Sequence, residues 1–288
     1  MKIGVSSYCY QPLLNKGAMS YFDVIEHAKK TGYNAIDFTD LKPPAGKSVN
    51  DFAGEIRAAC EKAGLEIVAY TIGADLIHSN IEEEVKRLKS CVDTAKILGA
   101  SMMRHDIVWN LSPEEKYPML KNRTWREVIS YIEKPVRELA EYAAGKGIKT
   151  MSENHGFVLQ QSERAEKLVL AVNHPNYGAL VDIGNFMCAD EPGLHALPTM
   201  LPYAFHIHVK DFLYRSGKEE RPDDSWFNTL QKNYLRGTVL GHGVVSVAQC
   251  IEVIKASGYN GCLTLEFEGL EEPLDAIKRG FDFIKRHI

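Results

Sequence analysis

The sequence lacks several features that mark particular classes of protein. No stretch approaches 18 uninterrupted apolar residues, so no membrane-spanning helix is expected. The six cysteines are scattered and form no CxxC pair, which is typical of free thiols in a reducing compartment. The first residues, MKIGVSSYCY, carry one lysine and no long apolar run, so they do not read as a signal peptide. We therefore expect a cytoplasmic protein with no membrane partner.

The chain also has little excess charge. Its 34 Lys and Arg residues and 38 Asp and Glu residues give a formal net charge of -4 at pH 7. Proteins that bind the nucleic-acid backbone depend on clustered Lys and Arg, so no nucleic-acid partner is expected. Hydrophobic residues make up 45% of the 288 residues, which is ordinary for a soluble globular protein and sufficient for a large core.

Short apolar or β-branched runs alternate with segments of helical periodicity along the whole chain. The runs predict strands at 2–8, 34–40, 65–72, 100–106, 147–156, 177–185, 204–211 and 261–269. The periodic segments predict helices at 20–31, 48–63, 80–98, 124–146, 162–172, 193–201, 246–256 and 272–287. Ser20 is the expected N-cap of the first helix, and Pro135 is expected either to kink the helix at 124–146 or to divide it.

Eight strand–helix units of about 36 residues (288/8) favour parallel pairing and closure into a (β/α)₈ TIM barrel of the α/β class. We interpret residues 1–288 as one catalytic domain. An open doubly wound sheet is the alternative, but it usually carries a glycine-rich turn after the first strand, and KIGVSSYCYQP has none. Two polar segments follow strand ends and are read either as lids or as ordinary insertions: 111–123 and 212–236.

Ionisable side chains gather at the carboxyl ends of the last four predicted strands, where a barrel builds its active site. They are Glu153 and His155, Asp182, His206, His208, Lys210 and Asp211, and Glu266 and Glu268. Carboxylates in apolar strands are costly to bury unpaired, so a cation is expected among them. Glu153, Asp182, His208 and Glu266 suit one divalent ion: Mn²⁺, Mg²⁺, Co²⁺ or Zn²⁺. Side chains two residues apart in a strand point to the same face, so His206 and His208 share a face, and so do Glu266 and Glu268. The rule therefore does not show which of the two glutamates is the ligand.

At the segments SENHG, LVDIGN, HIHVKD, VLGHGVV and YNGCLTLEFEG the sequence resembles the xylose-isomerase-like TIM-barrel superfamily of sugar phosphate isomerases and epimerases. The resemblance covers essentially the whole chain. It implies that Glu153, Asp182, His208 and Glu266 hold one divalent metal, and so selects Glu266 over Glu268. It also implies that Glu153 and Glu266 form the acid/base pair found in the ketose epimerases of that superfamily.

Some positions depart from the patterns of these relatives. Asn185 stands where endonuclease IV and the ketose epimerases carry histidine. Leu235 and Gly237 stand where endonuclease IV carries Asp and His, which argues against a three-metal site that cleaves DNA. His242 occupies a position in the GxG loop that is usually acidic, and the sequence suggests no role for it.

The expected function is therefore a metal-dependent isomerase or epimerase of a sugar or keto-sugar, with the metal stabilising an enediolate. The alternative is a dehydratase or lyase acting on an inosose-like or 3-keto-sugar substrate; a non-catalytic or nucleic-acid role is a third hypothesis. The substrate is expected to lack phosphate. The sequence leaves both a monomer and a homo-oligomer open. Predicted substrate contacts are His105, Lys210, His155, Asn185, Tyr8 and Trp109, and the pocket is expected to include Tyr10, Asp37, Tyr70 and Arg104 as well.

Overall fold

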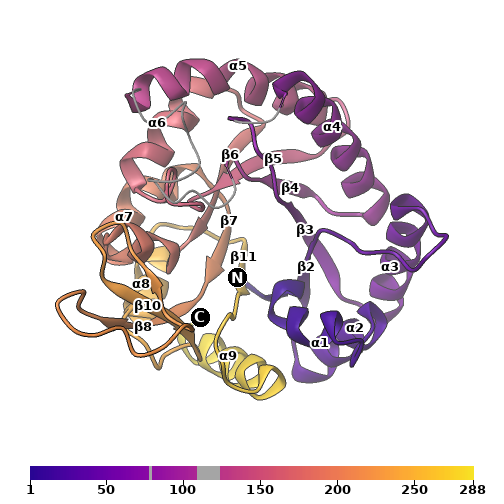
Figure 1. The fold of residues 1–288 in the computed structure, drawn as a ribbon. Coiled ribbons are helices and arrows are strands. Elements are labelled where there is room, and N and C mark those ends of the chain that lie inside the picture. Colours follow the sequence, from indigo (N-terminus) through magenta and orange to yellow (C-terminus); the bar gives the residue numbers. More distant parts are fainter. Residues whose placement is uncertain (78–79, 109–123) are drawn as a thin grey trace.

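The computed structural model describes residues 1–77, 80–108 and 124–288. Eight parallel strands close into a barrel in the order β1-β11-β7-β6-β5-β4-β3-β2, which confirms the predicted TIM barrel (Figure 1). The barrel strands are β1 (Lys2–Ser6), β2 (Ala35–Thr39), β3 (Glu66–Ile72), β4 (Met102–His105), β5 (Lys149–Glu153), β6 (Tyr177–Asp182), β7 (Ala204–Val209) and β11 (Cys262–Leu265). Each lies within a segment for which the sequence predicts a strand.

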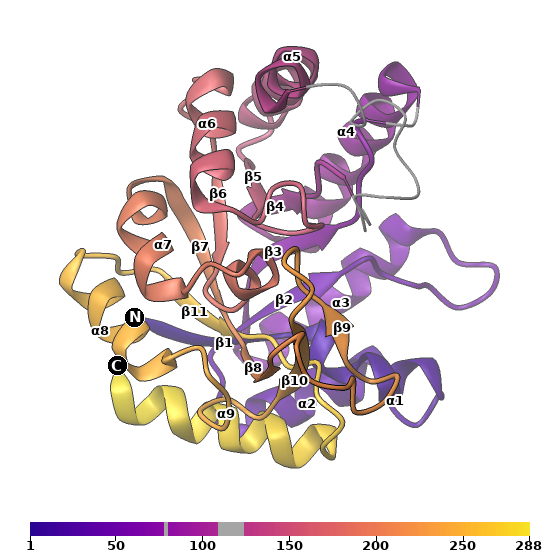
Figure 2. The same cartoon turned by 60° about the vertical axis from the view of Figure 1, so that its left-hand side comes forward.

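Helices surround the barrel and cover its outer face, as both ribbon views show (Figures 1 and 2). The long helices are α2 (Tyr21–Thr31), α3 (Val49–Ala63), α4 (Ile81–Leu98), α5 (Trp125–Ala144), α6 (Ser162–Val172), α7 (Gly193–Met200), α8 (Val247–Ala256) and α9 (Pro273–His287). Shorter helical turns are η1 (Ser7–Tyr10), α1 (Gln11–Asn15), η2 (Asn185–Ala189) and η3 (Leu201–Tyr203).

Local signals explain where these helices begin and end. Ser20 caps α2 in a capping box with Asp23, as the sequence predicts. Gly32 ends the same helix with φ 112°, a left-handed conformation that glycine adopts at low cost. Helix α5 runs continuously through Pro135, so the alternative of two separate helices is wrong.

The segment after β7 is more regular than the sequence suggests. In the polar segment 212–236 and next to it, β8 (Asp211–Arg215), β9 (Phe227–Asn228) and β10 (Tyr234–Thr238) form an antiparallel sheet in the order β8-β10-β9. The carboxylate of Asp211 accepts backbone hydrogen bonds from Gly241, Gly243 and Val245, and so ties the start of this sheet to the loop that follows it. The other polar segment, 111–123, lies outside the described residues, as does Trp109.

None of the helices in the described part of the chain is both long and apolar enough to cross a membrane.

Candidate metal and substrate site

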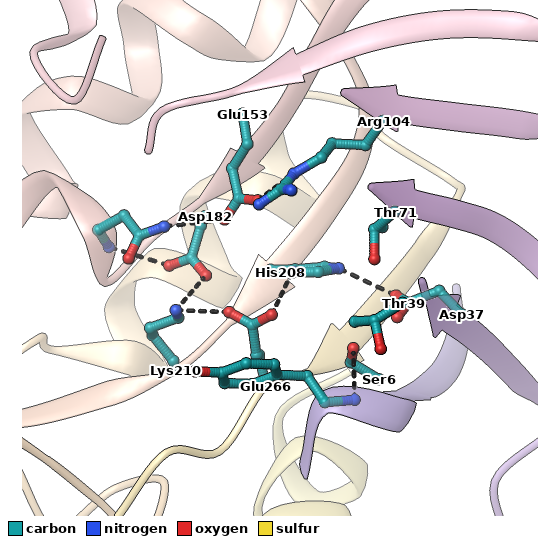
Figure 3. A network of polar contacts seen from close by, with 12 residues as sticks. Ser6, Asp37, Thr39, Thr71, Arg104, Glu153, Asp182, His208, Lys210 and Glu266 are labelled. Carbon is teal, nitrogen blue, oxygen red and sulfur yellow. Dashed lines mark hydrogen bonds and ion pairs between the residues drawn. The ribbon is translucent and has the colours of Figure 1, made fainter. Parts of the chain in front are cut away.

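Four side chains meet at the carboxyl end of the barrel, each from a neighbouring strand. Glu153 and Asp182 are the last residues of β5 and β6, His208 lies in β7, and Glu266 directly follows β11. All four are buried, and each offers one ligand atom within 4.8 Å of the others. The structure thus brings together the four residues predicted as metal ligands (Figure 3).

The inward-facing atoms of this cluster suit a divalent cation. His208 Nε2 donates a hydrogen bond of 2.9 Å to Asp37 Oδ2, which turns Nδ1 toward the cluster, 3.5 Å from Glu266 Oε1. Among the described residues, neither His208 Nδ1 nor Asp182 Oδ2 has a hydrogen-bond partner, although both are buried. A carboxylate that holds the outer nitrogen of a histidine is the usual arrangement around a metal-binding imidazole. The donor set therefore fits one divalent ion.

The other oxygen of Asp182 is held by the backbone. Asp182 Oδ1 accepts the N–H groups of Gly184 and Asn185 at 2.8 and 2.9 Å. Burial nevertheless raises the pKa of Asp182 to about 7, although Lys210 favours the ionised form. A bound cation would remove this penalty by stabilising the charged carboxylate.

Two basic side chains flank the cluster. Arg104, on β4, donates from Nε to Glu153 Oε2 at 2.7 Å. Lys210 Nζ lies 2.5 Å from Glu266 Oε2 and 3.4 Å from Asp182 Oδ2. Burial opposes ionisation of Glu266, but Lys210 and His208 hold its pKa well below the usual range. Glu266 is therefore kept as an anion, as a metal ligand must be.

A histidine–carboxylate pair stands beside the cluster. His155 Nδ1 donates to Asp106 Oδ1 at 3.1 Å, and Arg104 Nη1 lies 3.3 Å from the second oxygen of Asp106. Burial disfavours the charged imidazole, but Asp106 outweighs it and raises the pKa of His155. Because Asp106 fixes Nδ1 as the donor, Nε2 is the nitrogen that can exchange a proton with a ligand.

Apart from Asp182, which lies behind the wall, these charged side chains line one cavity of about 710 Å³. Its charged wall contains Glu153, His155, His208, Lys210, Glu266 and Glu268, with Arg104 and Asp106 beside them. The opposite wall consists mainly of neutral side chains from the ends of β1 to β3: Tyr8, Gln11, Thr39 and Thr71. This volume lies within the range of about 300–1,000 Å³ that is typical of ligand pockets.

The predicted substrate residues do not all reach this cavity. Lys210, His155 and Tyr8 line it. Asn185 instead sits behind the cluster, where its Nδ2 donates to Glu153 Oε1 at 2.8 Å. His105 is fully buried, and its Nδ1 contacts the backbone oxygen of Asp106. Successive residues of a strand point to opposite faces, so the inward direction of Arg104 turns His105 away from the cavity.

Three further residues expected in the pocket also lie elsewhere. The hydroxyl of Tyr10 contacts His27, and that of Tyr70 accepts a weak hydrogen bond from the backbone of Leu41. Asp37 is fully buried beneath the cluster, where it contacts both His206 and His208. The shared contact confirms that these two histidines lie on one face. His242 is exposed and lies outside the cavity lining.

Sequence reasoning missed Asp37 as the partner of His208, although a signal was present. Asp37 lies between Ile36 and Phe38 in an apolar strand, and the same pattern singled out Asp182. Asp106, the partner of His155, was also missed. Its significance depends on a contact with a residue distant in the sequence, which no local pattern contains.

A closed (β/α)₈ barrel with a buried His/Asp/Glu cluster at its carboxyl rim defines a metal-binding barrel enzyme. The family model described as Xylose isomerase-like TIM barrel matches residues 25–287, and the chain belongs to that family.

Individual relatives differ in the reactions that their names describe. An inosose dehydratase of Geobacillus thermodenitrificans is 25% identical over 236 residues, covering 79% of this chain and 76% of the relative. The 3-keto-D-glucoside 4-epimerase of E. coli has a similar fold, with TM-score 0.73, 17% identity and coverage of 99% of both chains. A xylose isomerase-like barrel protein of Mycobacterium smegmatis in complex with magnesium has TM-score 0.71 and 19% identity, covering 99% of this chain and 95% of that one.

Proposed function

We propose that the protein is a divalent-metal-dependent dehydratase that removes water from an inosose-like or 3-keto-sugar substrate. The unequal surroundings of the two glutamates carry this proposal. Glu153 accepts hydrogen bonds at both oxygens, from Arg104 and from Asn185. Glu266 pairs with Lys210 through Oε2, while Oε1 faces the cluster. The similarity to an inosose dehydratase supports the same assignment.

Glu153 is a poor proton carrier in this arrangement. Both of its oxygens already accept hydrogen bonds from fixed donors, the guanidinium of Arg104 and the amide of Asn185, so neither is directed at a substrate proton. Epimerisation through two glutamates needs proton transfer at both of them. Dehydration needs one base for the proton next to the carbonyl and one acid for the departing hydroxyl.

The chain supplies one candidate for each of these roles. Glu266 accepts the proton from the carbon next to the carbonyl, and Lys210 stabilises its carboxylate between turnovers. His155, held by Asp106, donates a proton to the hydroxyl group as its C–O bond breaks, so that water leaves. When held by Glu153, Asp182, His208 and Glu266, the divalent ion supplies Lewis-acid stabilisation of the negative charge that develops on the substrate oxygen.

An epimerase or isomerase is the second candidate. Glu153 and Glu266 both offer an oxygen to the same cluster, as an acid/base pair on two sides of one substrate carbon requires. The similar fold of a 3-keto-sugar epimerase keeps this chemistry open for the same site. In that case both glutamates exchange protons with the substrate and no water is lost.

One experiment separates the two candidates. The metal content of the purified protein is measured first, and the Mn²⁺-loaded protein is then incubated with an inosose and with 3-keto-sugars in D₂O. A product lighter by one water is the expected result. Deuterium beside the carbonyl without loss of water would favour the epimerase, and neither change in any substrate would contradict both proposals.

A matched pair of variants connects the result to the site. His155→Gln should slow the loss of water, because it removes the proposed acid. His242→Gln changes an exposed histidine outside the cavity lining and should leave the rate unchanged. Equal rates for the two variants would remove His155 from the mechanism.

A further inference from the structure

The hydrogen-bond ladder between β1 and β11 ends one residue before Glu266. Strands β1 and β11 are paired as far as Val5 and Leu265, and Glu266 is the next residue. After Ser6 the chain turns into η1, so the backbone of β1 offers no further ladder partner. On its other side Glu266 is still bonded, because its N–H donates to Val209 O of β7 at 3.0 Å.

The thiol of Cys9 forms the backbone hydrogen bonds around Glu266 that β1 does not supply. Cys9 Sγ donates to Leu265 O at 3.3 Å and accepts the N–H of Phe267 at 3.1 Å. The two bonded peptide groups lie directly before and after Glu266. Cys9 is 1% exposed, so water does not compete for these groups. Burial also raises the pKa of the Cys9 thiol, which keeps the proton that it donates.

Asp182 is held in the same way on another pair of strands. The β5–β6 ladder ends where Glu153 pairs with Leu180, two residues before Asp182. There Asn154 Nδ2 donates to Asp182 O at 2.9 Å, and Asp182 N donates to Asn154 Oδ1 at 2.8 Å. On its other side Asp182 still pairs with His208 of β7.

We propose that Cys9 and Asn154 are positioning residues that extend the barrel ladder by one step and thereby fix Glu266 and Asp182 as ligands. The inference rests on the proposed metal site. Two of the three carboxylates that project beyond the end of the ladder on one side, Glu266 and Asp182, have a neighbouring side chain bonded to the backbone around them. The third, Glu153, lies two residues beyond the last β4–β5 pair, and its carboxylate is held directly by Arg104 and Asn185. His208 is paired with both neighbouring strands.

The position of a metal ligand depends on its backbone, since a small shift at Cα moves the carboxylate oxygens by at least as much. Outer partners that orient ligands typically account for about 10- to 100-fold in metal affinity. A thiol forms weaker hydrogen bonds than an amide. We therefore expect Cys9 to lie near the lower end of this range and Asn154 above it.

The test compares two buried cysteines. Cys9→Ala removes both bonds to the backbone around Glu266, whereas Cys60→Ala removes an equally buried thiol, 1% exposed, from α3 on the outside of the barrel. Two measurements are made on each variant: hydrogen exchange at the Phe267 amide in metal-free protein, and the Kd for Mn²⁺. Cys9→Ala should speed the exchange and raise the Kd roughly tenfold.

Cys9→Ser keeps a donor and an acceptor and should recover most of the Mn²⁺ affinity, while Cys60→Ala should change neither measurement. A Cys9→Ala protein with wild-type exchange and wild-type Kd would overturn the proposal. If the wild-type protein binds no Mn²⁺, the metal site fails, and the exchange at Phe267 still decides whether Cys9 holds the backbone.

Asn154→Leu provides the second arm, because it keeps much of the side-chain volume and removes both bonds to Asp182. Its Kd for Mn²⁺ should rise more than that of Cys9→Ala. If Asn154→Leu does not fold, Asn154→Ala is measured in the same way. An unchanged Kd in the folded variant would remove Asn154 from the proposal.

Discussion

The two sides of the barrel mouth differ in chemical character. Apart from Asp40 and Lys42 at the exposed rim, the ends of β1 to β3 offer the cavity mainly hydroxyl and amide groups, such as those of Gln11, Thr39 and Thr71. The ends of β5, β6, β7 and β11 offer the clustered ligands and Lys210 (Figure 3). Arg104 of β4 joins the two sides through Glu153. Under the proposed function, the charged side holds the cation and performs proton transfer, while the other side binds neutral parts of the substrate.

The largest effect is expected on the charged side. Glu266→Gln removes both a ligand and the proposed base, so kcat should fall by at least about 10²- to 10⁴-fold, with a normal circular dichroism spectrum. Glu252→Gln, on the exposed face of α8, is the control and should keep the wild-type kcat. Full activity of Glu266→Gln would mean that the two sides do not divide the chemistry in this way.

A smaller effect is expected at Asp37, the buried partner of the ligand His208. Asp37→Asn weakens the contact that orients His208, so the Kd for Mn²⁺ should rise about 10- to 100-fold. Asp182→Asn and His208→Ala remove ligands directly and should lower metal occupancy further. Metal titration measures all three variants, and a wild-type Kd for Asp37→Asn would show that His208 is oriented without it.

The pair formed by His155 and Asp106 should make stability depend on pH. Although burial opposes it, Asp106 raises the pKa of His155 above its ordinary value of 6.5. The contribution to stability is therefore complete below about pH 6.5 and is lost as the pH rises through the pKa of the folded state. The difference in unfolding free energy between wild type and Asp106→Asn should be larger near pH 6 than near pH 9. An NMR titration of His155 gives the second check, since its pKa should be lower in the variant.

The smallest effect is expected on the neutral side. Gln11→Ala removes one polar group from the wall opposite the cluster, so KM should rise roughly 2- to 10-fold, the worth of one hydrogen bond. The kcat and the Kd for Mn²⁺ should stay unchanged. A fall in kcat with constant KM would place Gln11 with the proton-transfer groups. The neutral side would then also take part in the chemistry, and the two sides would not differ in function as proposed.

Local patterns were sufficient to predict the barrel and three of the four clustered side chains. Apolar runs and helical periodicity place the strands, and the rule that strand ends build the site brings Glu153, Asp182 and His208 together. Parity within a strand gives the common face of His206 and His208. The choice of Glu266 over Glu268 came from the family resemblance, because the two residues share a parity.

Contacts between distant strands were not predictable. Asp37 of β2 contacts His206 and His208 of β7, a strand that is not its neighbour in the sheet, and no local pattern shows which distant strands face each other. The sheet of β8, β9 and β10 was missed because its strands are short, and because charged residues in β8 and β10 interrupt the alternation of apolar and polar residues. His105 was wrongly expected in the pocket together with Arg104, although adjacent strand residues face opposite ways.

The pairing of β1 with β11 also affects when the site can form during translation. Glu153 is synthesised 113 residues before Glu266 (266 − 153). At 5–20 residues per second the interval is roughly 6 to 23 s. During that time the nascent chain carries up to three of the four clustered side chains, inside a barrel that lacks its closing strand. At the proposed metal site, the complete ligand set can therefore form only after β11 has been synthesised and has closed the barrel.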